Sequence, residues 1–184
     1  MRNRGLPANR SSLRKRRQRG SEMIEFTLSF LPMLMIMFLI LDLAWAVYTR
    51  ATLQYAVAQG LRYGVTSQTT TLNGKALGQV DSIRRKVQNS AFGKLGTTNS
   101  GAGWDSIQVH FYTPAGVDCT TTEGCNKTQP LVEVSVESFS QSTFLPTVRI
   151  PGLGTMSPIV MSARAWDRME GEPLGGAPLQ GNPP

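Results

Sequence analysis

The stretch FTLSFLPMLMIMFLIL, from Phe26 to Leu41, decides the fold because it contains no charged side chain. Extended to Tyr48, the same run would measure about 34 Å as an α-helix, at 1.5 Å per residue. A membrane span needs roughly 20 predominantly apolar residues. The sequence therefore predicts one membrane-spanning helix over about residues 26–48, with Trp45 and Tyr48 in an aromatic belt at its far end.

Basic side chains gather on the N-terminal side of this stretch. Residues 1–20 hold eight of the 19 Lys and Arg and no acid, which leaves 11 basic against 12 acidic side chains in the rest of the chain. The net charge of +7 is therefore a property of the leader. Lys and Arg beside an apolar helix hold that end in the cytoplasm, whereas nucleic-acid binding requires a basic patch on a folded face. We predict a cytoplasmic leader over residues 1–20 and no nucleic-acid partner.

The helix is expected to continue beyond the membrane and to span about Glu22 to Val65. Proline is absent from Trp45 to Gly64, whereas Pro32 lies in the membrane half and is expected to kink the helix there. Apolar residues in the second half recur with a period near 3.6 residues. This stripe is expected to cover a sheet, and it consists of Val47, Ala51, Tyr55, Ala58, Leu61 or Arg62, and Val65.

The residues after this helix predict a small domain over 67–170. Lys75–Ala91 places its apolar side chains on one face of a second helix, with Asn73 as its N-cap. Apolar and polar residues then alternate around 107–111, 132–137 and 159–166, which predicts strands. Three such strands favour an antiparallel sheet with one covered face. The fold class is therefore α+β.

Two further segments have compositions of their own. Residues 139–158 contain three prolines and several large apolar residues. This predicted loop either forms a contact surface or packs on its own domain. Residues 171–184 are rich in Gly and Pro, which predicts a disordered tail. The predicted organisation is a leader (1–20), a helix (21–66, with 49–66 outside the membrane), a domain (67–170) and a tail.

The two cysteines, Cys119 and Cys125, fall on the side of the membrane opposite the leader. In a bacterium that side is the periplasm, where disulfides persist. A metal site would need further ligands, the single histidine is His110, and a redox pair would show Cys-x-x-Cys spacing. We predict a structural disulfide between the two cysteines.

The sequence carries no recognisable catalytic pattern. No nucleophile elbow surrounds any serine, so nothing indicates that His110 acts in a triad. Phosphate-binding loops, metal-ligand clusters and dinucleotide fingerprints are absent from the sequence as well. We predict a protein that is not an enzyme and that needs no cofactor.

The junction Gly20-Ser21-Glu22-Met23-Ile24-Glu25-Phe26 ends the basic leader with a glycine and places an acid at the head of the apolar run. An acid there is costly, and such residues are usually functional. Cleavage after Gly20 would give Ser21 a free ammonium, which would attract the Glu25 carboxylate of its own or a neighbouring chain at the lipid edge. Without such a partner, Glu25 is simply an interfacial acid.

A different cleavage site would give a different class of protein. Ala44-Trp45-Ala46 is similar to an ordinary signal-peptidase site, and cleavage after Ala46 would release a secreted soluble protein. However, the apolar run exceeds the usual 7–15 residues of a signal peptide, and Asp42 falls in the cleavage region. An uncleaved single-span anchor is a third alternative, which leaves Gly20 unexplained.

Gly20 to Phe26, followed by the apolar helix, resembles the processing site of type IV pilins of the tight-adherence (Tad) branch. The run from Leu41 to Gly64, with its Gly60-Leu-Arg62-Tyr63 ending, resembles TadE-like proteins, and so does Ser162–Glu170. The main Flp-type pilin is much shorter than this chain. The resemblance therefore implies a minor pilin or pseudopilin.

The resemblance also implies how the chain is processed and what it contacts. A membrane-embedded prepilin peptidase would cleave after Gly20, so that Ser21 begins the mature protein and Glu25 serves as the assembly contact, followed by Phe26. The implied partners are a TadF-like minor pilin, the major pilin subunits and the Tad secretion platform. The implied role is pilus initiation and surface adhesion. The implied location is the bacterial inner membrane with a periplasmic C-terminal domain, or incorporation in the extracellular pilus.

Overall fold

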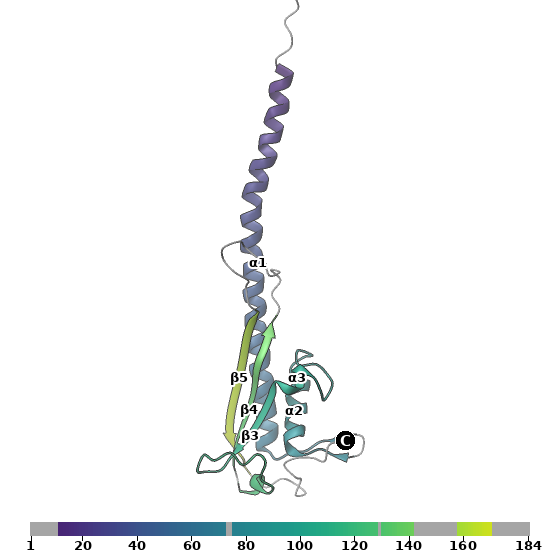
Figure 1. Cartoon of the computed structure of the whole chain (residues 1–184), viewed down its shortest axis with the longest axis vertical. Coiled ribbons are helices and arrows are strands. Elements are labelled where there is room, and N and C mark those ends of the chain that lie inside the picture. Colours follow the sequence, from purple (N-terminus) through teal and green to yellow (C-terminus); the bar gives the residue numbers. More distant parts are fainter. Residues whose placement is uncertain (1–10, 73–74, 129, 142–157, 171–184) are drawn as a thin grey trace, which may run out of the picture. The chain divides into compact units, whose positions relative to one another are not determined.

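The computed structural model describes residues 11–72, 75–128, 130–141 and 158–170. It divides the chain into two compact units, Met1–Leu43 and Ala44–Pro184, and the second is called the C-terminal unit below. The architecture is α+β, as the sequence predicts. A long N-terminal helix is followed by short helices and a three-stranded antiparallel sheet (Figure 1).

The first helix, α1, spans Ser11–Val65. It ends where the sequence predicts, but it begins well before Glu22, because the leader residues from Leu13 to Arg19 are mostly strong helix formers. The helix passes through Pro32 without ending. From Ser21 to Val65 it is long and apolar enough to cross a membrane, and none of its most apolar window is buried against the protein.

The sheet has the order β3-β4-β5, and both pairs are antiparallel. Its strands are β3 (Ile107–Tyr112), β4 (Leu131–Gln141) and β5 (Ile159–Arg168), so all three predicted strands are confirmed and β4 is longer than expected. The alternation gives the sheet one buried face. Its buried apolar side chains are Ile107, Val109, Phe111, Val132, Val134, Val136, Met161 and Ala163.

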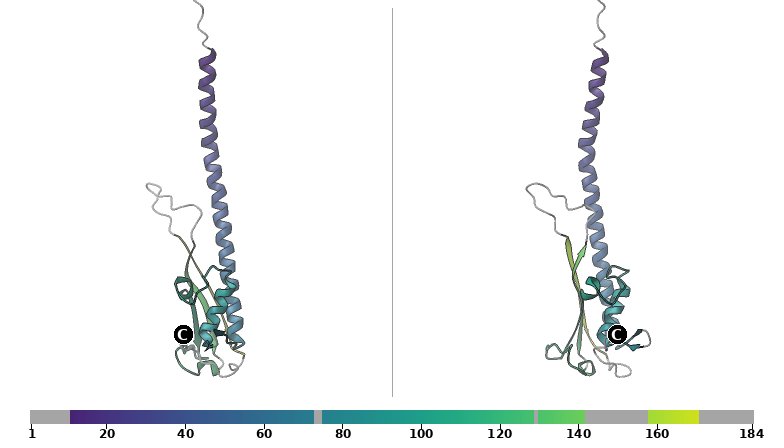
Figure 2. Two further views of the ribbon diagram at one scale, coloured as in Figure 1. Left: turned by 90° about the vertical axis from the view of Figure 1, so that its right-hand side faces the viewer. Right: turned by 45° about the vertical axis from the view of Figure 1, so that its right-hand side comes forward.

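The face of α1 that covers this sheet matches the predicted stripe only in part, since Leu61 and Val65 are buried but other members are not. Tyr55 is 50% exposed and Val47 is 62% exposed, whereas Leu53 and Val57 are buried in the core. The reason is that Gly60 and Gly64 lie on the side away from Tyr55 and allow close approach. A Cβ at Gly64 would lie 2.8 Å from Ile83 Cδ1, and one at Gly60 would overlap Val87 Cγ2. Figure 2 shows the C-terminal part of α1 on one side of the sheet.

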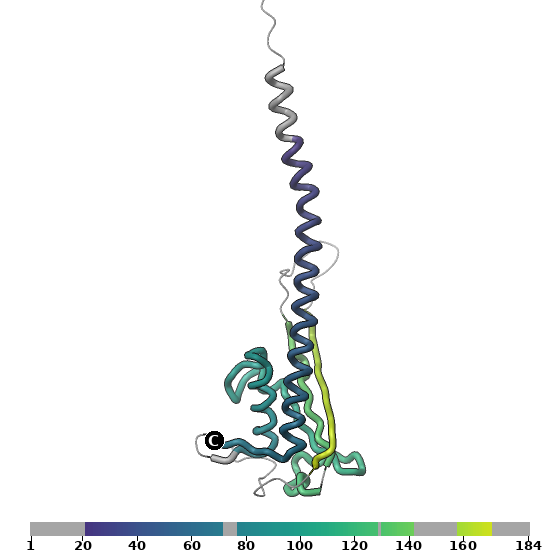
Figure 3. The backbone as a smooth tube through the Cα atoms, turned by 180° about the vertical axis from the view of Figure 1, so that it is seen from behind, coloured from purple at the N-terminus to yellow at the C-terminus, as the bar shows by residue number. Residues whose placement is uncertain are grey.

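The second helix, α2, spans Gln79–Ser90, and Figure 3 shows it beside the C-terminal part of α1. It begins later than the predicted Lys75, because a small hairpin of β1 (Thr71–Leu72) and β2 (Lys75–Ala76) takes up those residues. Gly78 precedes the helix, and the predicted cap Asn73 lies outside the described residues. The predicted apolar face is confirmed, since its members are buried: Leu77, Val80, Ile83, Val87 and Ala91.

Buried polar side chains fasten α1 and α2 to the loops of the C-terminal unit. Gln79 donates to the Gly64 carbonyl at 3.3 Å and accepts from Asn126 at 3.0 Å. Asn126 belongs to the 3₁₀ helix η1 (Cys125–Lys127). Gln88 donates to Leu95 O at 3.2 Å, in the segment that joins α2 to the short helix α3 (Ala102–Asp105). Most of the predicted contact loop, residues 142–157, and the predicted tail, residues 171–184, lie outside the described residues.

Candidate functional site

The predicted processing residues lie on α1. Gly20, Ser21, Glu25 and Phe26 all have helical backbone, and the side chains of the last three are exposed. Phe26 is 67% exposed and stacks on Phe30 with ring centroids 5.4 Å apart. The helix therefore exposes an acid, Glu25, and an aromatic residue, Phe26, at consecutive positions.

The helical backbone places Ser21 and Glu25 one turn apart. Residues four apart on a helix lie on the same face, so a free amino group at Ser21 would be within reach of the Glu25 carboxylate of the same chain. The neighbours of Glu25 are apolar and exposed, with Met23 at 76% and Ile24 at 70%. A carboxylate in such surroundings gains strongly from a positive partner, because water screens the pair poorly at a lipid edge.

The predicted disulfide is present between Cys119 and Cys125, whose Cα atoms are 6.0 Å apart. Both cysteines are buried in the core of the C-terminal unit. The Cys119 N–H donates to the Phe111 carbonyl at 2.8 Å, which fastens the closed loop to β3. The disulfide thus shapes the end of the sheet, and it lies in a different unit from the processing residues.

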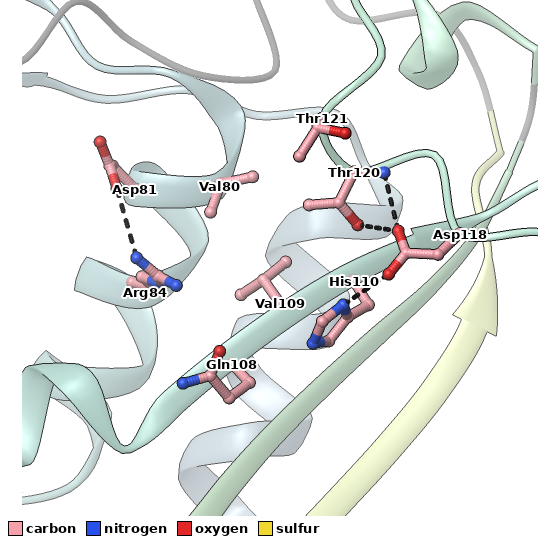
Figure 4. Close-up of a pocket in the computed structure, with 9 residues that line it drawn as sticks. All are labelled: Val80, Asp81, Arg84, Gln108, Val109, His110, Asp118, Thr120 and Thr121. Carbon is pink, nitrogen blue, oxygen red and sulfur yellow. Dashed lines mark hydrogen bonds and ion pairs between the residues drawn. The ribbon is translucent and has the colours of Figure 1, made fainter.

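His110 has a partner that the sequence does not reveal. Its Nδ1 lies 3.0 Å from Oδ2 of Asp118, and both residues face the same cavity (Figure 4). Hydrogen bonds from Thr120 are the main cause of the lowered pKa of Asp118, and His110 adds to the effect. The sequence gives one hint of this contact: Asp118 directly precedes Cys119, and the disulfide of Cys119 holds the neighbouring loop against β3.

The surroundings of His110 do not form a hydrolytic triad. In the described part of the chain its side-chain hydrogen-bond partner is Asp118, and no serine hydroxyl is bonded to it. Among the same residues, no group of three or more His, Cys, Asp or Glu is placed to hold a metal ion. The pair can orient a ligand or stabilise the loop, and these contacts suggest no further chemistry.

Comparison with known protein families gives a match over part of α1. Residues 20–62 match the family described as TadE-like protein, so this stretch of α1 is similar to the corresponding part of that family. The match begins at Gly20, includes Glu25 and Phe26, and ends at Arg62, shortly before the end of α1. No curated protein matches the chain. No solved structure matches it either.

Proposed function

We propose that this chain, which matches the TadE-like family over residues 20–62, is a minor pilin or pseudopilin of a Tad (type IVc) pilus. The family match is the observation that carries the proposal. The exposed apolar length of α1 supports it, since this helix can cross a membrane. The role is structural: the chain supports pilus initiation and surface adhesion as a subunit and is not an enzyme.

Processing is proposed to remove residues 1–20 and to leave Ser21 as the first residue. A membrane-embedded prepilin peptidase would cut the bond after Gly20. Because Gly20 lies within α1, the helix must open locally before a protease can reach the bond. Glycine assists this opening, since it is about 1 kcal/mol less favourable than alanine in a helix.

Glu25 is proposed to hold the mature subunit in register with its neighbour. Its exposed carboxylate would pair with the Ser21 ammonium of an adjacent subunit while the apolar residues around it remain in lipid or against other helices. Those adjacent subunits would be the major pilin and a TadF-like minor pilin, assembled on the Tad secretion platform. The positive leader supports an orientation with the N-terminus in the cytoplasm and the C-terminal unit in the periplasm.

We propose four segments for the chain, with boundaries set by charge, hydropathy and composition. The leader covers residues 1–20, the mature helix 21–66 (with its membrane part at about 26–48), and the periplasmic domain 67–170. The tail, 171–184, is proposed to be disordered on composition alone. The TadE-like match over residues 20–62 extends to both sides of Ala46, which supports keeping both sides of the alternative signal-peptidase site in one mature helix.

Two substitutions test processing and assembly separately. Gly20→Leu should block cleavage, so that the protein keeps the mass of the full chain. Glu25→Ala should leave protein level and cleavage largely intact while pili are lost, as counted by electron microscopy. Glu22→Ala is the matched control, because it removes an exposed acid from the same turn. Normal piliation in the Glu25 variant would refute the assembly role, and a shortened mass in the Gly20 variant would refute the processing site.

A further inference from the structure

A cavity of about 280 Å³ lies between the segment that follows α2 and the last part of β4. Its polar side chains are one lysine and four serines: Lys94, Ser100, Ser106, Ser138 and Ser140. No acid is among the described residues of this lining, and the carboxylate of the nearby Glu137 accepts from Arg164 at 3.3 Å. Hydroxyl groups beside an ammonium, without a carboxylate, favour an anionic ligand, because the ammonium can only donate.

The groups that a ligand would contact are accessible. Ser138 and Ser140 are exposed, and Lys94 is half-buried. Ser138 has a left-handed backbone, with φ of 56°, at the irregularity that shifts the register of β4 between Val136 and Phe139. Such a backbone is strained for a residue other than glycine, and strained residues cluster at ligand sites. Irregularities of this kind also redirect side chains next to functional sites. Both serines lie at or just after this one.

A contact with α1 fixes the depth of the cavity relative to the apolar run. Lys94 Nζ lies 3.9 Å from the centroid of the Trp45 ring. Trp45 is at the far end of the predicted membrane span, where an aromatic belt meets the headgroups. The ring is neutral, so the ammonium keeps its charge available for an anion beside it. Lysine side chains at such positions lay their apolar stem along apolar surface and keep the amine among polar groups.

The rise of β4 gives the same depth from a separate contact. Val132, near the start of β4, lies against Gly64 of α1, since its Cγ1 is 3.6 Å from a Cβ built there. The strand then runs beside α1 in the opposite direction (Figure 1). From Val132 to Ser140 it rises about 27 Å at 3.4 Å per residue. A helix covers that length in about 18 residues, so Ser140 lies level with about residue 46, next to Trp45.

We propose that this cavity binds the headgroup of an anionic phospholipid, taken from the bilayer surface on the side of the C-terminal unit. The Lys94 ammonium would pair with the phosphate, and the hydroxyls of Ser138 and Ser140 would bond its oxygens or the hydroxyls of a glycerol headgroup. Free phosphate shares this chemistry, but both depth estimates place the cavity at the bilayer, so the lipid is the source. A zwitterionic headgroup fits less well, because the described lining offers no acid to its cation. The inference rests on the membrane span of α1, which the proposed function shares, and not on the pilus role.

Reconstitution of the full-length protein in lipid nanodiscs tests this site by NMR. The nanodiscs contain phosphatidylcholine alone, or phosphatidylcholine with increasing fractions of phosphatidylglycerol. Phosphatidylglycerol should shift the amide resonances of Lys94, Ser138 and Ser140 until they saturate. It should not shift Val117, which follows β3 at the other end of the sheet. Inorganic phosphate added to the phosphatidylcholine nanodiscs should cause only a small part of these shifts, because it lacks the high local concentration of a headgroup held in the bilayer.

Two lysines that each lie over an aromatic ring of α1 provide matched variants. Lys94→Gln should raise the phosphatidylglycerol fraction at half-maximal shift about fivefold, as expected for the loss of one lysine at an anionic membrane surface. Lys86→Gln should not change it, because Lys86 Nζ lies 6.0 Å from the ring centroid of Tyr63, near the end of α1 away from Trp45. If Lys94→Gln does not fold, Ser140→Asp should weaken binding instead, since it adds a carboxylate to the cavity.

Three results would overturn the lipid site. They are full shifts with phosphatidylcholine alone, saturation of the same resonances by inorganic phosphate, and equal behaviour of the two lysine variants. Hydrogen exchange at residues 26–41 checks the premise, because helical amides in lipid should exchange slowly with water. Rapid exchange there would show that the span is wrong, and the lipid site would fall with it. Loss of the pilus assignment alone, tested by piliation, would leave all these readings unchanged.

Discussion

Thr49 is a fully buried residue of α1 whose hydroxyl has no hydrogen-bond partner in the described residues. Thr52, three residues later, instead donates to the Tyr48 carbonyl at 2.9 Å. A buried hydroxyl without a partner is destabilising, and an apolar group of the same shape removes that cost. We expect Thr49→Val to raise the free energy of unfolding by about 1 kcal/mol. Thermal unfolding in detergent measures it, with Thr52→Val as the control that loses a bond, and a lower melting temperature for Thr49→Val would contradict the prediction.

Asp118 gives the C-terminal unit a dependence on acid pH. Its folded-state pKa is lowered, first by hydrogen bonds from Thr120 and then by His110. The ionised carboxylate therefore stabilises the fold above the unfolded-state pKa of about 3.9, and this contribution is lost as pH falls through the lower folded-state value. The side chain is partly exposed, so solvent limits the effect. Asp118→Asn should flatten the fall in melting temperature below about pH 4; a fall as steep as that of the unaltered protein would refute this origin.

At the scale of elements, the contact between α1 and α2 depends on Gly60. A Cβ at this position would overlap Val87 Cγ2, and Val87 is fully buried. Alanine favours a helix over glycine by about 1 kcal/mol, but overpacking a core costs about 1–3 kcal/mol. We expect Gly60→Ala to lower the melting temperature in spite of its helix propensity. Gln59→Ala, at the neighbouring and less buried position, should leave it nearly unchanged, and a stabilised Gly60 variant would disprove this packing.

The sequence predicts the strands more accurately than it predicts the bounds and buried faces of the helices. The three strands follow from the alternation around Val109, Val134 and Ala163, because one buried face imposes a period of two residues. The covering face of α1 was predicted only in part: Leu61 and Val65 are buried, but Val47 and Tyr55 are exposed, since alanines on both sides leave the 3.6-residue period ambiguous. The start of α2 was also wrong, because the hairpin at 71–76 has no strong pattern of its own.

The candidate sites also differ in how far the sequence predicts them. Gly20, Glu25 and Phe26 stay a prediction from the sequence, where their signal is local, and the family match includes all three positions. The pairing of His110 with Asp118 depends on how the segment before the disulfide folds back onto β3. This contact joins residues on separate segments, so no local pattern predicts it.

For the whole molecule, the mature N-terminus separates the competing functions. Mass spectrometry of the membrane fraction should find a chain that begins at Ser21. The physical reason is that the exposed apolar side chains of α1, from Met23 onward, need lipid or other helices around them. A chain that begins at Val47 in the soluble fraction would contradict the pilin proposal and support the secreted alternative.

The end of β5 returns to the end of α1. The Glu170 N–H donates to the Val65 carbonyl at 3.3 Å, and Met169 beside it is buried in the core. The helix is made early in synthesis, whereas the strand that completes the sheet is made more than ninety residues later. The C-terminal unit therefore cannot close until Glu170 has left the ribosome. Until then, the apolar side of α1 that meets the sheet lacks β5, so the sheet is completed only after β5 has been made.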